Sequence, residues 1–212
     1  QEESGKVGVP ASFAGTSEIV IIADSTTPAD FVAVDLAVQA EHGPGGKSWL
    51  VTTDENLANE VESELEDLLF KSSRSESIKS TFETGGYCVL VDDLGHAVEI
   101  VDTVSPEHLQ IMTEKPNELS KKISNAGAIF CGEWSPASLG DYLAGPSHVH
   151  PTSGTARFSG ALTVKDFIRD MHVITSSKEA LNRLGPHVIN LADAEGLPTH
   201  ADSIRLRVKD DE

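Results

Sequence analysis

Two polar side chains, Gln39 and His42, close a segment with helical periodicity. Residues i and i+3 share one helix face, so the Gln39 carbonyl oxygen and a His42 ring nitrogen can reach one metal ion. The same residues also suit an ordinary helix end, because Gly43 accepts the left-handed conformation and Pro44 prevents continuation. The spacing leaves both interpretations open.

A second polar pair, Glu107 and His108, lies in "SPEHL", where a predicted helix gives way to a predicted strand. The two side chains are proton acceptors of different basicity, which suits activating water and taking a proton from an alcohol. Ligands of open parallel sheets collect beyond the carboxyl ends of strands, whereas this pair precedes its strand. A proline-initiated turn with polar edges is the alternative.

Two later stretches carry further candidate ligands. "GDYLAGPSHVHP" (140–151) contains Asp141, His148 and His150 beside glycines that permit close backbone approach. "AEGLPTHAD" (194–202) contains Glu195 and His200. The alternatives are a capping aspartate, surface histidines and a boundary between two helices.

Four of these residues together form a possible metal site. Gln39, His42, Asp141 and His200 supply oxygen and nitrogen donors without a thiolate. Such a set suits zinc or another divalent metal with a position open to substrate. Spacing alone does not show that the four converge.

Alternating strand and helix patterns must position these residues. Short runs rich in β-branched residues alternate with amphipathic segments, which predicts an α/β fold with a parallel sheet flanked by helices. The predicted strands are 18–24, 47–53, 87–93, 108–113 and 127–132, and the predicted helices are 28–43, 54–70, 94–104 and 116–125.

The pattern changes after residue 132. Residues 133–160 are rich in Gly, Ser, Pro and His, and so long a loop in a compact domain is usually functional or disordered. We expect an α/β catalytic domain over 1–162 and a small helical tail over 163–212. The tail is too thin for its own core, so it must pack on the main domain or on another subunit.

Composition excludes several classes of protein. The 212 residues include 34 acidic and 16 basic side chains, a net charge of −18 that disfavours nucleic acid as a partner. No apolar run is long enough to span a membrane. Residues 1–8 are polar and acidic, which argues against a signal peptide. Cys88 and Cys131 lie in apolar runs and are expected to be reduced core residues of a cytoplasmic protein.

Five segments resemble, in order, the L-histidinol dehydrogenase family. The resemblance covers nearly the whole chain and rests on "SEIVIIAD", "DLAVQAEHGP", "SPEHLQIMT", "AGAIFCGEWSPASLGDYLAGPSHVHPTSGTARFSGALTVKDF" and "EGLPTHADSIRLRV". It implies an incomplete Rossmann-like domain in a cytoplasmic homodimer. It also implies zinc-dependent oxidation of L-histidinol to L-histidine, in two NAD-dependent steps through an aldehyde-level intermediate.

The resemblance assigns a role to each candidate residue. It implies that Glu107 and His108 accept protons and that Ser17, His148 and Glu195 contact the substrate. In the family the tail crosses to the other subunit, so residues of the tail would complete the neighbouring site. The implied zinc ligands, which also contact the substrate together with His108, are Gln39, His42, Asp141 and His200.

The chain also departs from the family. Family members are longer, and the missing N-terminal half contributes the region that binds the dinucleotide, so no NAD contact is assigned and the isolated chain is expected to be inactive. "GVPASFAGTSE" near Ser17 differs from the usual pattern, as do Ser147 and His150. Two other functions stay open: a non-catalytic metal- or ligand-binding dimer module, and a dehydrogenase for another amino or sulfonated alcohol.

Overall fold

A computed structural model describes residues 15–208. The chain divides into two compact units, Gln1–Ile168 and Arg169–Glu212. The roles expected for 1–162, as a catalytic domain, and for 163–212, as a dimer-forming tail, stay predictions. Residues 1–8, whose composition argued against a signal peptide, lie outside the described residues.

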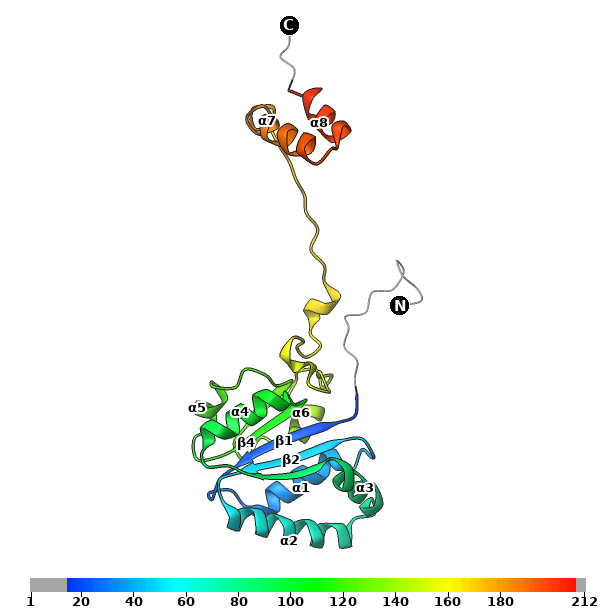
Figure 1. Cartoon of the computed structure of the whole chain (residues 1–212). Helices are drawn as coiled ribbons and strands as arrows, with labels where there is room; N and C mark the ends of the chain where they lie inside the picture. The colour runs from blue at the N-terminus through cyan, green and yellow to red at the C-terminus, as the bar shows by residue number, and fades with distance from the viewer. Residues whose placement is uncertain (1–14, 209–212) are drawn as a thin grey trace. The chain divides into compact units, whose positions relative to one another are not determined.

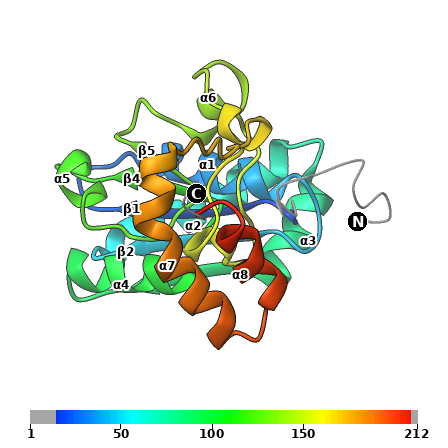
Figure 2. The same ribbon diagram turned by 90° about the horizontal axis from the view of Figure 1, so that it is seen from above.

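The first unit is built on one sheet of five parallel strands, which confirms the predicted α/β fold class. The strand order is β3-β2-β1-β4-β5, and Figure 2 shows β5, β4, β1 and β2 side by side in that order. The strands are β1 (Glu18–Ala23), β2 (Lys47–Thr52), β3 (Gly86–Leu90), β4 (His108–Met112) and β5 (Ala128–Cys131).

Helices cover both faces of this sheet (Figure 1). On one face lie α1 (Ala29–Ala40), α2 (Glu55–Lys71) and α3 (Ser75–Gly85), and on the other lie α4 (Leu94–Val104) and α5 (Pro116–Ser120). Alternate residues of β1 serve the two cores, with Ile21 facing α1 and Ile22 facing α4. Both are fully buried, which explains the unbroken apolar run.

Three helices differ from the prediction. α3 was not predicted, because its Ser- and Thr-rich sequence has weak helix propensity. Tertiary contacts stabilise it instead: Ile78 is buried, and the Thr81 hydroxyl lies 2.9 Å from the Ala40 oxygen and 2.7 Å from the Gly43 oxygen. The predicted helix 116–125 is shorter, and the loop 133–160 contains the unpredicted α6 (Ala137–Tyr142).

The crossovers bring helix ends to the amino-terminal edge of the sheet. In a right-handed β-α-β unit the helix runs back along the sheet, so the C-terminal end of α1 returns to the edge where β1 begins. Gly43 follows this helix end and has a positive φ of +115°, as predicted for a glycine that ends a helix. The last turn of α1 thus presents its side chains where β1 and β4 start.

The second unit is a pair of helices, α7 (Lys178–Ala194) and α8 (Pro198–Arg205). α7 continues through Pro186. Within these two helices only Gly185, Ala192 and Ala201 are buried. Large apolar side chains stay exposed on this unit, namely Leu184, Val188, Leu191, Leu197 and Leu206.

Two further observations bear on the sequence interpretation. Among residues 15–208, no helix is long and apolar enough to cross a membrane. The prediction that Cys88 and Cys131 are core residues is wrong: Cys88 is exposed and Cys131 is half-buried. Both lie on β3 and β5, the two outer strands of the sheet within the part of the chain that the structure describes.

Helix α2 offers a direct test of local stability. The Asp54 side chain caps it by accepting the backbone N–H groups of Asn56 and Leu57. We expect Asp54→Ala to lower the free energy of unfolding by about 1 kcal/mol, because two first-turn donors lose their acceptor. Urea unfolding followed by circular dichroism measures this, with the exposed Glu60→Ala on the same helix as control. Equal stability of the two variants would contradict the capping role.

Candidate functional site

The candidate site begins where β1 and β4 start side by side. Glu18 is the first residue of β1 and His108 the first of β4. The Glu107 carboxylate accepts the backbone N–H of Glu18 at 2.9 Å, and the Glu18 carboxylate accepts the N–H of Ser153 at 3.2 Å. These bonds join both strands to the long loop, so the predicted pair Glu107 and His108 is held rigidly at the sheet edge.

The His108 ring has one nitrogen fixed and one nitrogen free. Its Nδ1 lies 3.0 Å from the Glu18 carbonyl oxygen, which can only accept a hydrogen bond. Nδ1 therefore carries a proton, and in the neutral ring Nε2 holds the lone pair. Nε2 is buried without a hydrogen-bond partner among the described residues, and it lies 3.6 Å from Oδ1 of Asp141. The ring is thus oriented to act as a base through Nε2.

Neighbouring acidic groups raise the pKa of His108. Burial alone lowers it, but the hydrogen bond and charge of Glu107, the Glu18 carbonyl and the charge of Asp141 more than offset burial. Glu107 Oε2 lies 3.4 Å from His108 Nδ1. A buried imidazole with a raised pKa is a stronger proton acceptor than a free one, as expected of a general base.

Two rings enclose His108. Phe130 of β5 stacks on it with ring centroids 6.0 Å apart, and His150 meets it edge-on at 5.2 Å. His150 is buried, its Nδ1 has no partner among the described residues, and burial followed by the charge of His108 lowers its pKa. The sequence pointed to His150 in "GDYLAGPSHVHP", but the predicted site left it out.

Gln39 and His42 differ in their surroundings. Gln39 is buried in the last turn of α1, and its Nε2 has no hydrogen-bond partner among the described residues. His42 lies just beyond α1 and is exposed. A buried amide without a partner is costly, so the orphaned Gln39 side chain indicates space for a ligand.

The remaining predicted residues are spread over both units. Ser17 is half-buried directly before β1, and His148 is exposed in the long loop. Glu195 ends α7 and His200 lies in α8, and both are exposed. No described contact joins Ser17 or His148 to His108, and Glu195 and His200 belong to the second unit, so the roles of all four residues stay predictions.

The first unit contains several side chains whose donor atoms suit a divalent metal. Among residues 15–208, no three His, Cys, Asp or Glu side chains lie together closely enough to hold a metal ion. Three of the predicted ligands, Gln39, His42 and Asp141, nevertheless lie in this unit. The same unit holds the orphaned side-chain atoms of Gln39, His108 and His150. These nitrogen and oxygen donors fit a divalent metal in chemical type, and the predicted set stays incomplete without His200 of the second unit.

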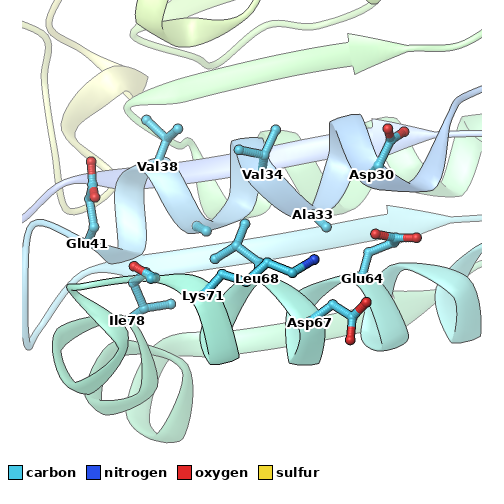
Figure 3. Close-up of a pocket in the computed structure, with 12 residues that line it drawn as sticks. Asp30, Ala33, Val34, Val38, Glu41, Glu64, Asp67, Leu68, Lys71 and Ile78 are labelled. Atoms are coloured by element: carbon cyan, nitrogen blue, oxygen red, sulfur yellow. The ribbon is translucent and has the colours of Figure 1, made fainter.

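A separate groove lies away from the candidate site. A groove of about 500 Å³ runs between α1 and α2 (Figure 3). Figure 3 shows the apolar side chains of Val34 on α1 and Leu68 on α2, with the carboxylates of Asp30 and Glu64 toward one end of the groove. None of the predicted site residues lines it, so we do not assign the site to this groove.

The raised pKa of His108 gives a test of the site's electrostatics. We expect Glu107→Gln to lower this pKa, because the substitution removes a negative charge while keeping an oxygen that accepts the Glu18 N–H. Two-dimensional NMR of the ring nitrogens measures the titration, with the exposed Glu99→Gln on α4 as control. An unchanged His108 titration in Glu107→Gln would contradict the assignment.

The same shift predicts a dependence of stability on pH. A histidine whose folded pKa exceeds its unfolded value stabilises the fold fully below the unfolded pKa, and this contribution is lost as the pH rises through the folded pKa. The free energy of unfolding should therefore fall as the pH rises above the ordinary histidine value of 6.5, and fall less in Glu107→Gln.

Comparison with known proteins places the chain in one family. A family model described as histidinol dehydrogenase matches residues 3–208. The histidinol dehydrogenase of Prochlorococcus marinus is 44% identical over 203 residues, covering 96% of this chain and 46% of the relative. That of Caldanaerobacter subterraneus is 46% identical over 190 residues, covering 90% of this chain and 44% of the relative.

A solved structure agrees with this assignment. The crystal structure of histidinol dehydrogenase from Elizabethkingia anophelis superposes with a TM-score of 0.86 and 32% identity, covering 92% of this chain and 45% of that one. The chain therefore spans about half the length of the relatives it matches. Since the family model covers nearly all of the sequence, the chain belongs to the histidinol dehydrogenase family.

Proposed function

We propose that this chain forms the catalytic, zinc-binding part of an NAD-linked oxidoreductase that converts L-histidinol to L-histidine through histidinal, in the last steps of histidine biosynthesis. The observation that supports this most is the buried His108, whose free Nε2 lies 3.6 Å from Asp141 and whose Nδ1 is held by the Glu18 carbonyl. An alcohol oxidation needs such a base beside the carbinol.

His108 and Glu107 divide the proton transfers. His108 accepts the alcohol proton at Nε2, and its hydrogen bond to Glu18 keeps that nitrogen unprotonated in the neutral ring. Glu107 deprotonates the water that adds to the aldehyde. Each proton transfer of this kind contributes on the order of 10² to 10⁴ in rate. NAD, when bound, accepts the hydride, and its contacts are not assigned to this chain.

The metal would be held by side chains from both units. Gln39, His42 and Asp141 are the proposed ligands in the first unit, with His200 of the partner subunit as the fourth. Zinc, when bound, supplies a redox-inert centre that holds the substrate amine and imidazole. The support is the donor chemistry and the orphaned Gln39 amide.

We further propose a cytoplasmic homodimer that exchanges tails. The second unit buries only three small residues in its helices and exposes several leucines, so it gains from packing against another surface. Exchange would bring Glu195 of the partner subunit to the substrate, beside Ser17 and His148. The net charge of −18 repels the phosphate backbone, so we propose no nucleic-acid partner.

A metal- or ligand-binding dimer module without hydride transfer is the alternative function. The pairing of Glu107 with a buried His108 favours the enzyme, because metal binding alone does not need two adjacent proton acceptors. A dehydrogenase for another amino or sulfonated alcohol would use the same base.

Zinc content tests the proposed ligands. We expect the purified chain to hold one zinc per site and His42→Ala to lose it, because removing one of four ligands leaves the metal exchangeable. His96→Ala, an exposed histidine on α4, is the matched control. Metal analysis after dialysis against a weak chelator measures this, and equal zinc in His42→Ala and the unaltered chain would remove the ligand assignment.

Turnover tests whether the 212-residue chain carries a dinucleotide site of its own. We expect the 212-residue chain alone to show no NAD reduction with L-histidinol, because we assign it no dinucleotide site. Absorbance of NADH at increasing L-histidinol concentration measures this in the zinc-loaded chain. Robust hydride transfer by the chain alone would refute the expectation and would also exclude the non-catalytic module.

A further inference from the structure

A buried polar pair lies beneath the candidate site and takes no part in the chemistry proposed above. Gln110 of β4 is fully buried, and Asp35 of α1 is 8% exposed. Gln110 Nε2 donates a hydrogen bond to Asp35 Oδ2, and Gln110 Oε1 accepts the backbone N–H of Ala137 at 3.2 Å. Through these two hydrogen bonds, Gln110 of β4 links α1 and the start of α6.

Two of these residues lie one step from a candidate site residue. Asp35 and Gln39 are four residues apart on α1, and therefore share a helix face with a separation of about 6 Å. Gln110 and His108 are two residues apart on β4, and therefore share a sheet face with a separation of about 6.6 Å. The two steps are nearly equal in length. Gln39 and His108 are therefore displaced from Asp35 and Gln110 by a similar distance along their elements.

α6 also carries one residue of this hydrogen-bonded group and one candidate site residue. Ala137 begins α6, and Asp141 follows one turn later. α6 packs closely on β5, since a Cβ at Gly140 would lie 2.5 Å from the Phe130 ring. The bond from Ala137 to Gln110 therefore fixes the start of a short helix whose next turn carries Asp141.

A purely stabilising role explains this pair poorly. Burial raises the pKa of Asp35, and only the hydrogen bond from Gln110 acts against it. Buried polar pairs of this kind are often no more stabilising than well-packed apolar residues of similar volume. Apolar residues, however, would leave the Ala137 N–H, a donor of the first helical turn, without an acceptor.

We propose that Asp35 and Gln110 are positioning residues, whose hydrogen-bonded layer holds the metal- and proton-binding side chains of α1, β4 and α6 at a fixed separation. The inference rests on the proposed function, because it concerns the geometry of that site. Groups behind metal ligands act in this way, and their loss typically lowers metal affinity about 10- to 100-fold.

The test compares zinc affinity of the full chain with variants of the layer, using the metal alone. We expect Gln110→Leu to weaken zinc binding at least about tenfold, measured by chelator competition. Ser48→Ala is the matched control, because it removes a different buried hydrogen bond to α1, from the Ser48 hydroxyl to the Leu36 oxygen at 3.0 Å. The control should bind zinc as the unaltered chain does.

A swap of the two groups distinguishes positioning from general damage. Gln110→Glu alone sets two carboxylates against each other and should weaken zinc binding. Adding Asp35→Asn restores one donor and one acceptor between the pair, and leaves an oxygen for Ala137. The double variant should therefore regain most of the affinity. Unchanged affinity in Gln110→Leu, or no recovery in the double variant when it is folded, would overturn the proposal.

A metal-free measurement keeps the two proposals separate. If the unaltered chain binds no zinc, the proposed metal site is refuted. Crystal structures of the unaltered chain and of a folded layer variant then decide the positioning role. We expect α6 to shift and the 3.6 Å contact between His108 Nε2 and Asp141 Oδ1 to lengthen. Retention of that contact in Gln110→Leu, or in Gln110→Glu if the leucine variant does not fold, would refute the positioning role of Asp35 and Gln110.

Discussion

The hydrogen bond from His108 Nδ1 to the Glu18 carbonyl oxygen determines what the site can do. A carbonyl only accepts, so this bond fixes the tautomer and directs the basic nitrogen toward Asp141. The bond exists because β1 and β4 pair in a register that sets Ile19 opposite His108. A slip of one residue would turn the His108 side chain to the other face of the sheet, among the residues packed on α4.

The site lies at the unusual edge of the sheet. Open parallel sheets bind ligands beyond the carboxyl ends of their strands, and by that rule the pair Glu107 and His108 lay outside any site. Here the end of α1 and the loop after β5 both return to the amino-terminal edge and supply Gln39, Asp141 and His150 there. Fold class alone therefore does not locate the chemistry, and the side chains do.

Much of the first unit could be predicted from the sequence, because apolar runs and helical periodicity report burial directly. α3 could not, since its helix depends on the bonds from Thr81 to a neighbouring helix end. Motifs identified Glu107 and His108, and the structure places them together. Asp35 and Gln110 carried no motif, because their partners are distant in sequence and meet only through the packing of three elements.

The division of the chain at residue 168 has a consequence for mixed dimers. The proposed ligands Gln39, His42 and Asp141 belong to one unit, and the proposed ligand His200 belongs to the other. Under the proposed tail exchange, a chain damaged only in α1 and a chain damaged only in α8 would form a mixed dimer. One of its two sites would combine the intact parts of both chains. The two damaged chains together would then form one complete set of ligands, which two chains damaged in the same unit could not do.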